Sequence, residues 1–234
     1  MTPMDAARAA LKEVFGYDDF RPGQEDAVAA ILRGRDVMAV MPTGAGKSLC
    51  YQIPALVLEG VTLVVSPLIS LIERRSIRKY KPEQIRDEEL NAVLEAGMYA
   101  PSGRGHQSTL MVVVQDPETI SMLSRMNAAI WGKANTDPFY GAPTVIVVLA
   151  DTSRSTWVED GSLVMGNLMN AAHALGLGSC WVHRARQVHE TDAGRELLRK
   201  WGVPEGYAGV GNCILGYPDG EVPKAAPRKE NFII

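Results

Sequence analysis

Cysteine is scarce in this sequence, and neither a long apolar run nor an excess of basic charge is present. The three cysteines, Cys50, Cys180 and Cys213, have no paired or metal-ligand spacing, which argues against a disulfide framework and favours a reducing compartment. No apolar run approaches the roughly 20 residues that a membrane-spanning helix needs. The net charge of −3 provides no global basic field for nucleic acid.

Two further classes of protein are excluded by the placement of charge and of metal-ligating residues. Residues 1–20 carry charged side chains from Asp5 to Asp19 and do not have the pattern of a secretory signal. No group of histidine, cysteine and acidic residues has metal-ligand spacing, so no metal site is expected. We therefore expect a soluble, cytoplasmic protein that has neither a membrane nor a nucleic acid as a partner.

A glycine-rich turn lies between residues 42 and 48. The β-branched run Val37 to Met41 is expected to form a strand, which leads into Pro42-Thr43-Gly44-Ala45-Gly46-Lys47-Ser48 and then a helix. In such an arrangement backbone N–H groups surround phosphates, the lysine reaches the outer phosphates and the serine holds Mg²⁺. Although Met41 stands where the strict pattern has glycine, the turn indicates a segment derived from a nucleotide-binding protein.

Three stretches in this part of the sequence resemble the start of a RecQ-type DNA helicase. They are Phe15-Gly16-Tyr17 with Phe20-Arg21-Pro22-Gly23-Gln24, Met41 to Gln52, and Val64 to Leu71. The resemblance implies that adenine and phosphate would be held by Tyr17, Arg21, Gln24, Gly44, Gly46, Lys47 and Ser48. It stops near Leu71, before the acidic and arginine-bearing motifs that a motor needs. Residues 1–65 are therefore expected to be a partial α/β P-loop segment without complete motor activity.

The octet Glu73-Arg74-Arg75-Ser76-Ile77-Arg78-Lys79-Tyr80 follows directly, and half of its residues are cationic. Ser66 and Pro67 suit the start of a helix that would bury Leu68, Ile69 and Ile72 and deliver the cationic cluster at its end. Because forked guanidinium donors match phosphate oxygens, the octet predicts an anion site. A solvated basic turn is the alternative.

Helical and strand patterns alternate in the rest of the sequence. Helices are expected from Asp87, from Pro117, through Val164 to Leu175 and over 190–201; buried strands are expected at Leu110 to Val114 and Thr144 to Ala150, and shorter extended pieces up to Val182 and from Val210 to Gly216. This alternation favours an α/β or α+β fold. The small-residue loop Met98 to Gln107 would let a flat ligand approach the backbone. Arg228-Lys229 is a second cationic site or a solvated tail.

Residues 72–234 resemble the FMN-dependent nitroreductases. Four motifs carry the resemblance: the octet 73–80, Ala100-Pro101-Ser102-Gly103 with Gln107, Leu175 to Arg184, and Gly211 to Pro218 with Pro227 to Asn231. The resemblance implies an α+β fold, a central and mainly antiparallel sheet flanked by helices, for residues 66–234. Residues 66–72 would serve as the first helix of that domain.

The same resemblance implies a set of flavin contacts. Arg74, Arg75 and Ser76 would bind the phosphate and ribityl chain, with Arg228 and Lys229 from the far end of the chain. Arg78 would lie by the pyrimidine edge, where positive charge stabilises a reduced anion. The ring would be approached by Pro101, Ser102, Gly103 and Gln107, in part from a partner subunit, and by Val182, His183 and Arg184, with backbone N–H groups near N5 and O4. Gly105, Ser108-Thr109 and Arg184 depart from residues that many members have.

The function that follows is an FMN-dependent oxidoreductase. The resemblance implies a homodimer with FMN at its interface, which takes hydride from NADH or NADPH and reduces nitroaromatics, quinones or related small-molecule acceptors by a ping-pong mechanism. Because the flavin carries the chemistry, no catalytic side chain is expected. For residues 1–65 two alternatives stay open: an ATP-binding or DNA-remodelling module, or a passive appendage. The acceptor and the choice between NADH and NADPH stay open as well.

Overall fold

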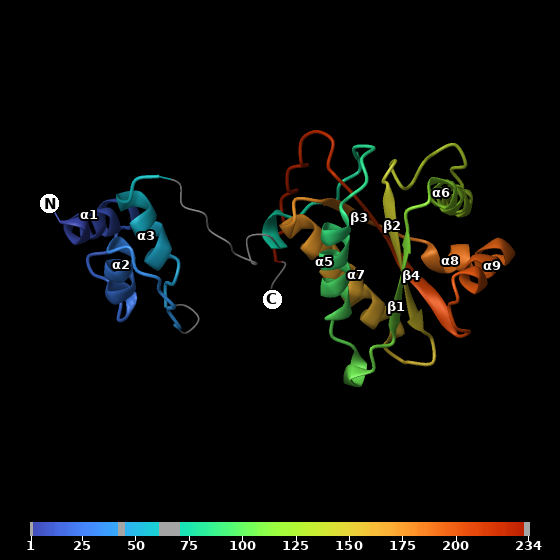
Figure 1. Cartoon of the computed structure of the whole chain (residues 1–234), viewed down its shortest axis with the longest axis horizontal. Helices are drawn as coiled ribbons and strands as arrows, with labels where there is room; N and C mark the ends of the chain where they lie inside the picture. The colour runs from blue at the N-terminus through green and yellow to red at the C-terminus, as the bar shows by residue number, and fades with distance from the viewer. Residues whose placement is uncertain (1, 42–44, 61–70, 232–234) are drawn as a thin grey trace. The chain divides into compact units, whose positions relative to one another are not determined.

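The computed structural model describes residues 2–41, 45–60 and 71–231, and the chain divides into two compact units, Met1–Ser66 and Pro67–Ile234. Figure 1 shows the helices and strands of both. None of the helices in the described ranges is long and apolar enough to cross a membrane.

The first unit contains three helices, α1 (Pro3–Phe15), α2 (Gln24–Leu32) and α3 (Leu49–Val57). A capping box between Thr2 and Asp5 starts α1, and Gly16, at φ 72°, ends it. The helix predicted after Lys47-Ser48 is α3, with Ser48 at its N-cap. The three helices bury a small core that consists of Ala7, Leu11, Val28, Leu49 and Ile53.

The strand predicted at Val37 to Met41 is wrong, because residues 35–41 have no regular secondary structure. The side chains of Met38 and Val40 are 92% and 91% exposed. A strand must pair its backbone N–H and C=O groups with a neighbour, and the described residues of this unit include no other strand. The second predicted extended run, Val61 to Val65, lies outside the described residues.

The second unit is built on a sheet of four antiparallel strands, β1 (Thr109–Val114), β2 (Thr144–Asp151), β3 (Gly178–Val182) and β4 (Tyr207–Gly216). Their order in the sheet is β1-β2-β4-β3. β2 pairs with β1 from Thr109↔Ala150 to Val114↔Val145, and with β4 from Thr144↔Leu215 to Asp151↔Tyr207. The mainly antiparallel sheet and the α+β class predicted from the sequence are confirmed.

Helices cover both faces of this sheet (Figure 1). On one face α5 (Asp87–Met98) and α7 (Trp157–Ala174) pack on Ile146, Val148 and Ala150 of β2. On the other, α6 (Pro117–Trp131), α8 (Ala185–Glu190) and α9 (Asp192–Lys200) pack on Val145, Val147 and Leu149. Successive β2 side chains thus enter two different cores, as the pleat of a strand requires. The continuous apolar run of β2 follows from this double burial.

Four local expectations for the second unit need correction. Leu110 and Val113 are each 36% exposed rather than buried, because β1 lies at the sheet edge and pairs with β2 alone. The helix predicted over 190–201 is interrupted at Thr191, which caps α9. Arg86 rather than Asp87 is the N-cap of α5. Of the first helix predicted for 66–72, Leu71 and Ile72 are helical and residues 66–70 lie outside the described residues, but the Ile72 side chain is 72% exposed rather than buried.

Candidate functional site

The cationic octet is held against the edge strand β3. Ser76 forms a parallel bridge with Ser179, and the backbone N–H of Ile77 donates to the Ser179 carbonyl oxygen at 2.9 Å. The Ile77 side chain packs directly on Gly178, where a Cβ atom would come within 2.9 Å of Ile77 Cγ2. These contacts extend the sheet by a short segment and fix the backbone from which Arg74 and Arg75 project.

Both of these guanidinium groups contain a buried donor without a partner. Arg75 Nη1 donates to the carbonyl oxygens of Ile72 and Arg74 at 2.7 and 2.8 Å, but Arg75 Nε and Arg74 Nη1 are buried and have no hydrogen-bond partner among the described residues. Leaving a buried donor unpaired costs about 1–3 kcal/mol, and more for a charged group. Two such donors on adjacent residues fit a bound phosphate, which would satisfy both.

The chain after β4 returns to the same octet. The N–H of Lys81 donates to the Tyr217 carbonyl at 2.9 Å, and the N–H of Asp219 donates to the Lys79 carbonyl at 3.1 Å. The Lys79 ammonium also pairs with Asp219 at 2.7 Å. The segment after the octet and the segment after β4 therefore lie side by side, at residues 79–81 and 217–219.

Two of the predicted phosphate contacts come from beyond this point. Arg228 and Lys229 are exposed, and no described hydrogen bond or ion pair joins Arg228 to Arg74. Arg78 is exposed as well, and Ser76 is half-buried. The convergence of Arg228 with Arg74 on one phosphate stays a prediction.

The predicted ring-binding loop 101–107 is tied to α7 by Asp160. This carboxylate is 2% exposed and accepts hydrogen bonds from the Gly103 N–H at 2.8 Å and from Ser108 Oγ at 2.7 Å. Burial opposes ionisation of Asp160, but the hydrogen bonds from Ser108, Gly103 and Thr156 outweigh it and lower the pKa of the carboxyl. Thr156 lies so close to the loop that a Cβ atom on Gly103 would come within 2.3 Å of its hydroxyl oxygen. The loop needs glycine at that position.

Within the loop itself, the Ser102 hydroxyl accepts from the N–H of Gln107 at 2.9 Å. Gln107 adopts a left-handed backbone, with φ 49°, and Arg104 does so with φ 53°. Pro101 and Gln107 are exposed, and Ser102 and Gly103 are half-buried. The loop thus presents backbone and small side chains to the outside, as a surface that approaches a flat ligand would.

The turn between β3 and α8 contains the second predicted group of ring contacts. Its backbone is held by two buried amides: Asn127 of α6 donates to the His183 carbonyl at 2.7 Å, and Asn212 of β4 donates to the Val182 carbonyl at 3.4 Å. Arg184 then turns the chain into α8 with φ 78°, a left-handed conformation that is unusual for arginine. Val182 is buried, His183 exposed and Arg184 half-buried.

The octet and the β3–α8 turn lie at opposite ends of one strand. Ser76 pairs near the start of β3 at Ser179, and His183 follows its last residue. Four residues of extended chain span about 13 Å. That length is on the scale of an extended flavin mononucleotide, with the phosphate at one end of the strand and the ring at the other.

Asp160 and Asn127 were missed by sequence reasoning. Asp160 stands in the first turn of the mostly apolar helix α7, and Asn127 faces the core from α6 with no exposed surface. A polar side chain among residues with helical apolar spacing was the available signal. Their partners lie 57 and 56 residues away in the sequence, so only the tertiary structure shows what they hold.

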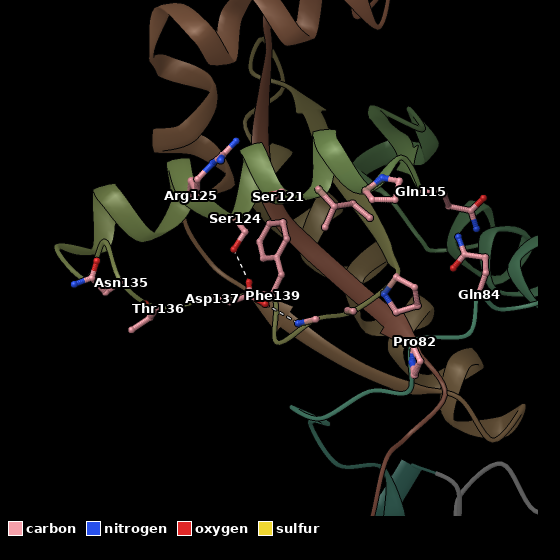
Figure 2. A pocket seen from close by; sticks show the side chains of 15 residues that line it. Pro82, Gln84, Gln115, Ser121, Ser124, Arg125, Asn135, Thr136, Asp137 and Phe139 are labelled. Carbon is pink, nitrogen blue, oxygen red and sulfur yellow. Dashed lines mark hydrogen bonds between the residues drawn. The ribbon is translucent and has the colours of Figure 1, made fainter.

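A large cavity of about 820 Å³ lies away from all of these residues, between α6 and the loop 135–143 (Figure 2). Figure 2 shows Ser124 and Asp137 pointing toward one another across its floor. Asp137 accepts from Ser124 and from the N–H groups of Phe139 and Gly141, so it fastens the loop to the helix. No predicted cofactor residue lines this cavity.

In the first unit, a cavity of about 310 Å³ is lined by five of the predicted nucleotide contacts, Tyr17, Arg21, Gln24, Gly46 and Ser48. The buried Gln24 amide accepts from the Arg21 N–H at 2.8 Å and donates to the carbonyls of Ala45 and Gly46 at 3.0 and 2.9 Å. It thereby joins the start of α2 to the glycine-rich turn.

Of the remaining two predicted nucleotide contacts, only Lys47 belongs to the described residues, and it does not line this cavity. Lys47 donates to the Met41 carbonyl at 2.9 Å and lines a neighbouring hollow, and Gly44 lies outside the described residues. In the described ranges no group of three or more histidine, cysteine or acidic side chains is placed to hold a metal ion.

Comparison with known proteins supports two origins for the chain. A model described as the nitroreductase family matches residues 71–217. A nitroreductase with bound FMN from Bacteroides fragilis is 28% identical, with a TM-score of 0.67, and the match covers 73% of this chain and 98% of that one. An FMN-dependent nitroreductase from Clostridium difficile is 30% identical, with a TM-score of 0.64, and covers 71% and 97%.

Among curated proteins, the relatives are RecQ-type helicases. The RecQ-like DNA helicase blm-1 of Caenorhabditis elegans is 46% identical over 125 residues, which are 52% of this chain and 12% of that protein. The ATP-dependent DNA helicase RecQ of Haemophilus influenzae is 61% identical over 67 residues, 29% of this chain and 11% of that protein. The chain thus spans about a tenth of the length of these helicases. Both resemblances predicted from the motifs are confirmed.

Proposed function

Because the chain belongs to the nitroreductase family, we propose that it is an FMN-dependent oxidoreductase that uses NADH or NADPH to reduce nitroaromatics, quinones or related acceptors. The observation that carries the proposal is the pair of buried, unpartnered guanidinium donors on Arg74 and Arg75. A dianionic phosphate that bridges them would compensate two unpaired charged donors at once. In this proposal Ser76 contacts the ribityl chain, and Arg228 and Lys229 complete the phosphate site.

The flavin ring would lie across the β3–α8 turn. Asn127 and Asn212 hold the carbonyl groups of His183 and Val182. The N–H groups near His183 and Arg184 would then face the ring at N5 and O4. Pro101, Ser102, Gly103 and Gln107 would approach from the partner subunit of a homodimer, on the loop that Asp160 fastens to α7. Arg78 would place positive charge by the pyrimidine edge.

The bound cofactor supplies hydride acceptance from the nicotinamide and electron delivery to the acceptor. The protein binds and orients: a rigid turn and a fastened loop define one face against which donor and acceptor lie in succession, which gives ping-pong kinetics. The positive charge of Arg78 would stabilise the negative charge of a reduced flavin. No side-chain acid or base takes part.

Anaerobic reduction tests the function directly. The purified full chain, saturated with FMN and freed of excess, is mixed with NADH or NADPH while the visible flavin band is recorded. The band should bleach, and it should return when a quinone or a nitroaromatic is added. A chain that retains no FMN, or retained FMN that neither nucleotide bleaches, would contradict the proposal.

The three cysteines are free and buried, which supports a reducing, cytoplasmic location.

A second function is favoured by the 310 Å³ cavity that gathers five of the helicase-type contacts. We propose that the first unit binds an adenine nucleotide without the turnover of a motor. Titration of the full chain with a fluorescent ATP analogue measures this binding, and Lys47→Ala should weaken it. Equal signals from the wild-type chain and Lys47→Ala would leave the unit as a passive appendage.

A further inference from the structure

Two cations converge on one indole ring beside the β3–α8 turn. Lys133 Nζ lies 4.3 Å from the centroid of Trp131, and Arg184 Cζ lies 4.8 Å from the same point. The two charges are therefore at most about 9 Å apart. In the described part of the chain neither forms an ion pair with a carboxylate, so this corner of the turn has uncompensated positive charge.

The support beneath this cluster is rigid. Asn127 of α6 fixes the His183 carbonyl, Trp131 ends the same helix one turn later, and Lys133 follows directly after its C-cap Gly132. Arg184 keeps its position although its backbone is left-handed, with φ 78°. Trp131 is 38% exposed, Arg184 is half-buried and Lys133 is exposed. An incoming molecule can thus reach the indole and both charges.

A neighbouring arginine provides the contrast. Arg186 lies two residues further along the chain, in α8, and its Cζ is 5.6 Å from the ring centroid of another tryptophan, Trp157. Unlike Arg184, it pairs with Glu190, at 2.9 Å from Nε to the carboxylate. The charge of Arg186 is compensated within α8, and that of Arg184 is left for a ligand.

We propose that Trp131, Lys133 and Arg184, which we call the Trp131 cluster, bind an anionic group of the molecule that enters the flavin site. The inference rests on the proposed function, because the turn that contains Arg184 is the one that faces the flavin ring. The anion is a carboxylate, sulfonate or phosphate. It belongs to an aromatic acceptor that stacks on Trp131, or to the pyridine nucleotide. The cluster therefore sets a preference for charged over neutral substrates.

Matched ligand pairs test the proposal on the full, FMN-loaded chain. Benzoate and benzamide, which are not reduced, are titrated while the visible flavin spectrum reports binding. The ratio of kcat/KM for 4-nitrobenzoate and 4-nitrobenzamide, and for NADPH and NADH, is measured alongside. All measurements are made at a single pH near 8.

The variants are chosen so that the backbone survives. Arg184→Gly removes the charge at a φ that glycine adopts freely, and Lys133→Gln removes the other charge. Arg186→Gln is the control, because it removes a nearby positive charge of α8 that Glu190 already compensates. In at least one pair, the wild-type chain should bind or turn over the anionic member about tenfold better than the neutral or less charged one. A tenfold ratio corresponds to about one charge-assisted hydrogen bond. Arg184→Gly and Lys133→Gln should each reduce that preference severalfold, and Arg186→Gln should leave it unchanged.

Each outcome decides the matter. A preference confined to benzoate assigns the anion to the acceptor, and one confined to NADPH assigns it to the nucleotide phosphate. Equal binding of both members of every pair by the wild-type chain, or an equal loss in Arg186→Gln, overturns the proposal. If the chain holds no FMN, the proposed function fails. Calorimetric titration of benzoate and benzamide, which needs no flavin, then judges the Trp131 cluster alone.

Discussion

The two units of this chain differ in how far apart in the sequence the partners of their site residues lie. In the first unit, the Gln24 amide reaches carbonyls only 21 and 22 residues away and so keeps a nucleotide-sized cavity together. In the second unit, Asp160 and Asn127 hold their loops across 57 and 56 residues, over a sheet covered on both faces. A short piece of a protein can retain a locally built cavity, whereas the proposed flavin site needs the complete fold of the second unit.

The exposed apolar residues show the other side of the same difference. Met38 and Val40 lie open in the first unit, while Val145 to Ala150 of β2 are 0% exposed in the second. Both runs are apolar and rich in valine. Among the described residues, only the second run has strands on both sides and helices on both faces of its sheet, so the neighbours rather than the run itself decide whether a strand forms.

The largest expected effect concerns the phosphate site. The double variant Arg74→Ala, Arg75→Ala should raise the dissociation constant of FMN at least about 100-fold, since each charge-assisted hydrogen bond contributes roughly 1.5–3 kcal/mol. Quenching of flavin fluorescence measures it. Two variants serve as controls: Arg125→Ala removes an exposed cation that lines the 820 Å³ cavity, and Lys47→Ala removes one from the first unit. Both should bind FMN as the wild type does. Equal weakening in either control would sink the phosphate assignment.

A pH effect that depends on histidine should be confined to the second unit, because all four histidines, at 106, 173, 183 and 189, lie there. Burial lowers the pKa of His189 to about 4, against the opposing hydrogen bond to Ala185. Below about pH 6.5 the unfolded imidazole gains a proton that the folded one refuses. The contribution of neutral His189 to the free energy of unfolding is therefore fully present above that pH, and roughly 3 kcal/mol of it is lost as the pH approaches 4.

Denaturant unfolding followed by tryptophan fluorescence isolates this effect, because all four tryptophans belong to the second unit. The variant His189→Gln should lose much less stability than the wild type between about pH 7 and pH 4.5. Glu89, whose pKa is lowered to about 2 by hydrogen bonds from Arg86 and Tyr217, loses its contribution only at lower pH. Parallel pH curves for the two proteins would show that His189 is not the source.

The third effect tests the fastening of loop 101–107. Gly103→Ala should destabilise the second unit by about 2 kcal/mol, the typical cost of overpacking, because the new methyl group meets the Thr156 hydroxyl. Thr156→Ala alone removes only a 3.3 Å hydrogen bond to Asp160. Combined with Gly103→Ala, it should restore at least half of the loss, as measured by a double-mutant cycle. Simple additivity would mean that the loop does not pack on Thr156 in solution.

The smallest effect is expected in the first unit. Met38→Ser with Val40→Ser should change its unfolding free energy by no more than about 0.5 kcal/mol, because both side chains are already exposed. Far-ultraviolet circular dichroism follows that transition, and light scattering should show less self-association. A loss of several kcal/mol would reveal that residues 37–41 are packed after all, and the contrast between the units would disappear.

Much of this fold could be predicted from apolar periodicity and helix-end residues. The stop of α1 at Gly16, the start of α6 at Pro117 and the buried strand β2 follow from local sequence. The motifs also indicated the octet and the small-residue loop as binding elements. The motifs did not include Asp160 or Asn127, which hold backbone groups 57 and 56 residues away in the sequence.

The two errors about strands share one physical cause. Val37 to Met41 was expected to be a strand and Leu110 to Val114 a buried one, since both are apolar and β-branched. The first lacks a pairing partner among the described residues, and the second lies at a sheet edge. Pairing and burial of a strand are properties of the whole sheet, which a local pattern does not contain.

We expect residues 67–234 to hold the proposed flavin without help from the first unit. A specific protease site placed between Ser66 and Pro67 allows the FMN-loaded full chain to be cut and its two pieces separated by gel filtration. We predict that the visible flavin absorption elutes with the carboxyl-terminal piece, at an undiminished FMN-to-protein ratio. Release of free FMN on cleavage, or flavin that elutes with the amino-terminal piece, would contradict the claim.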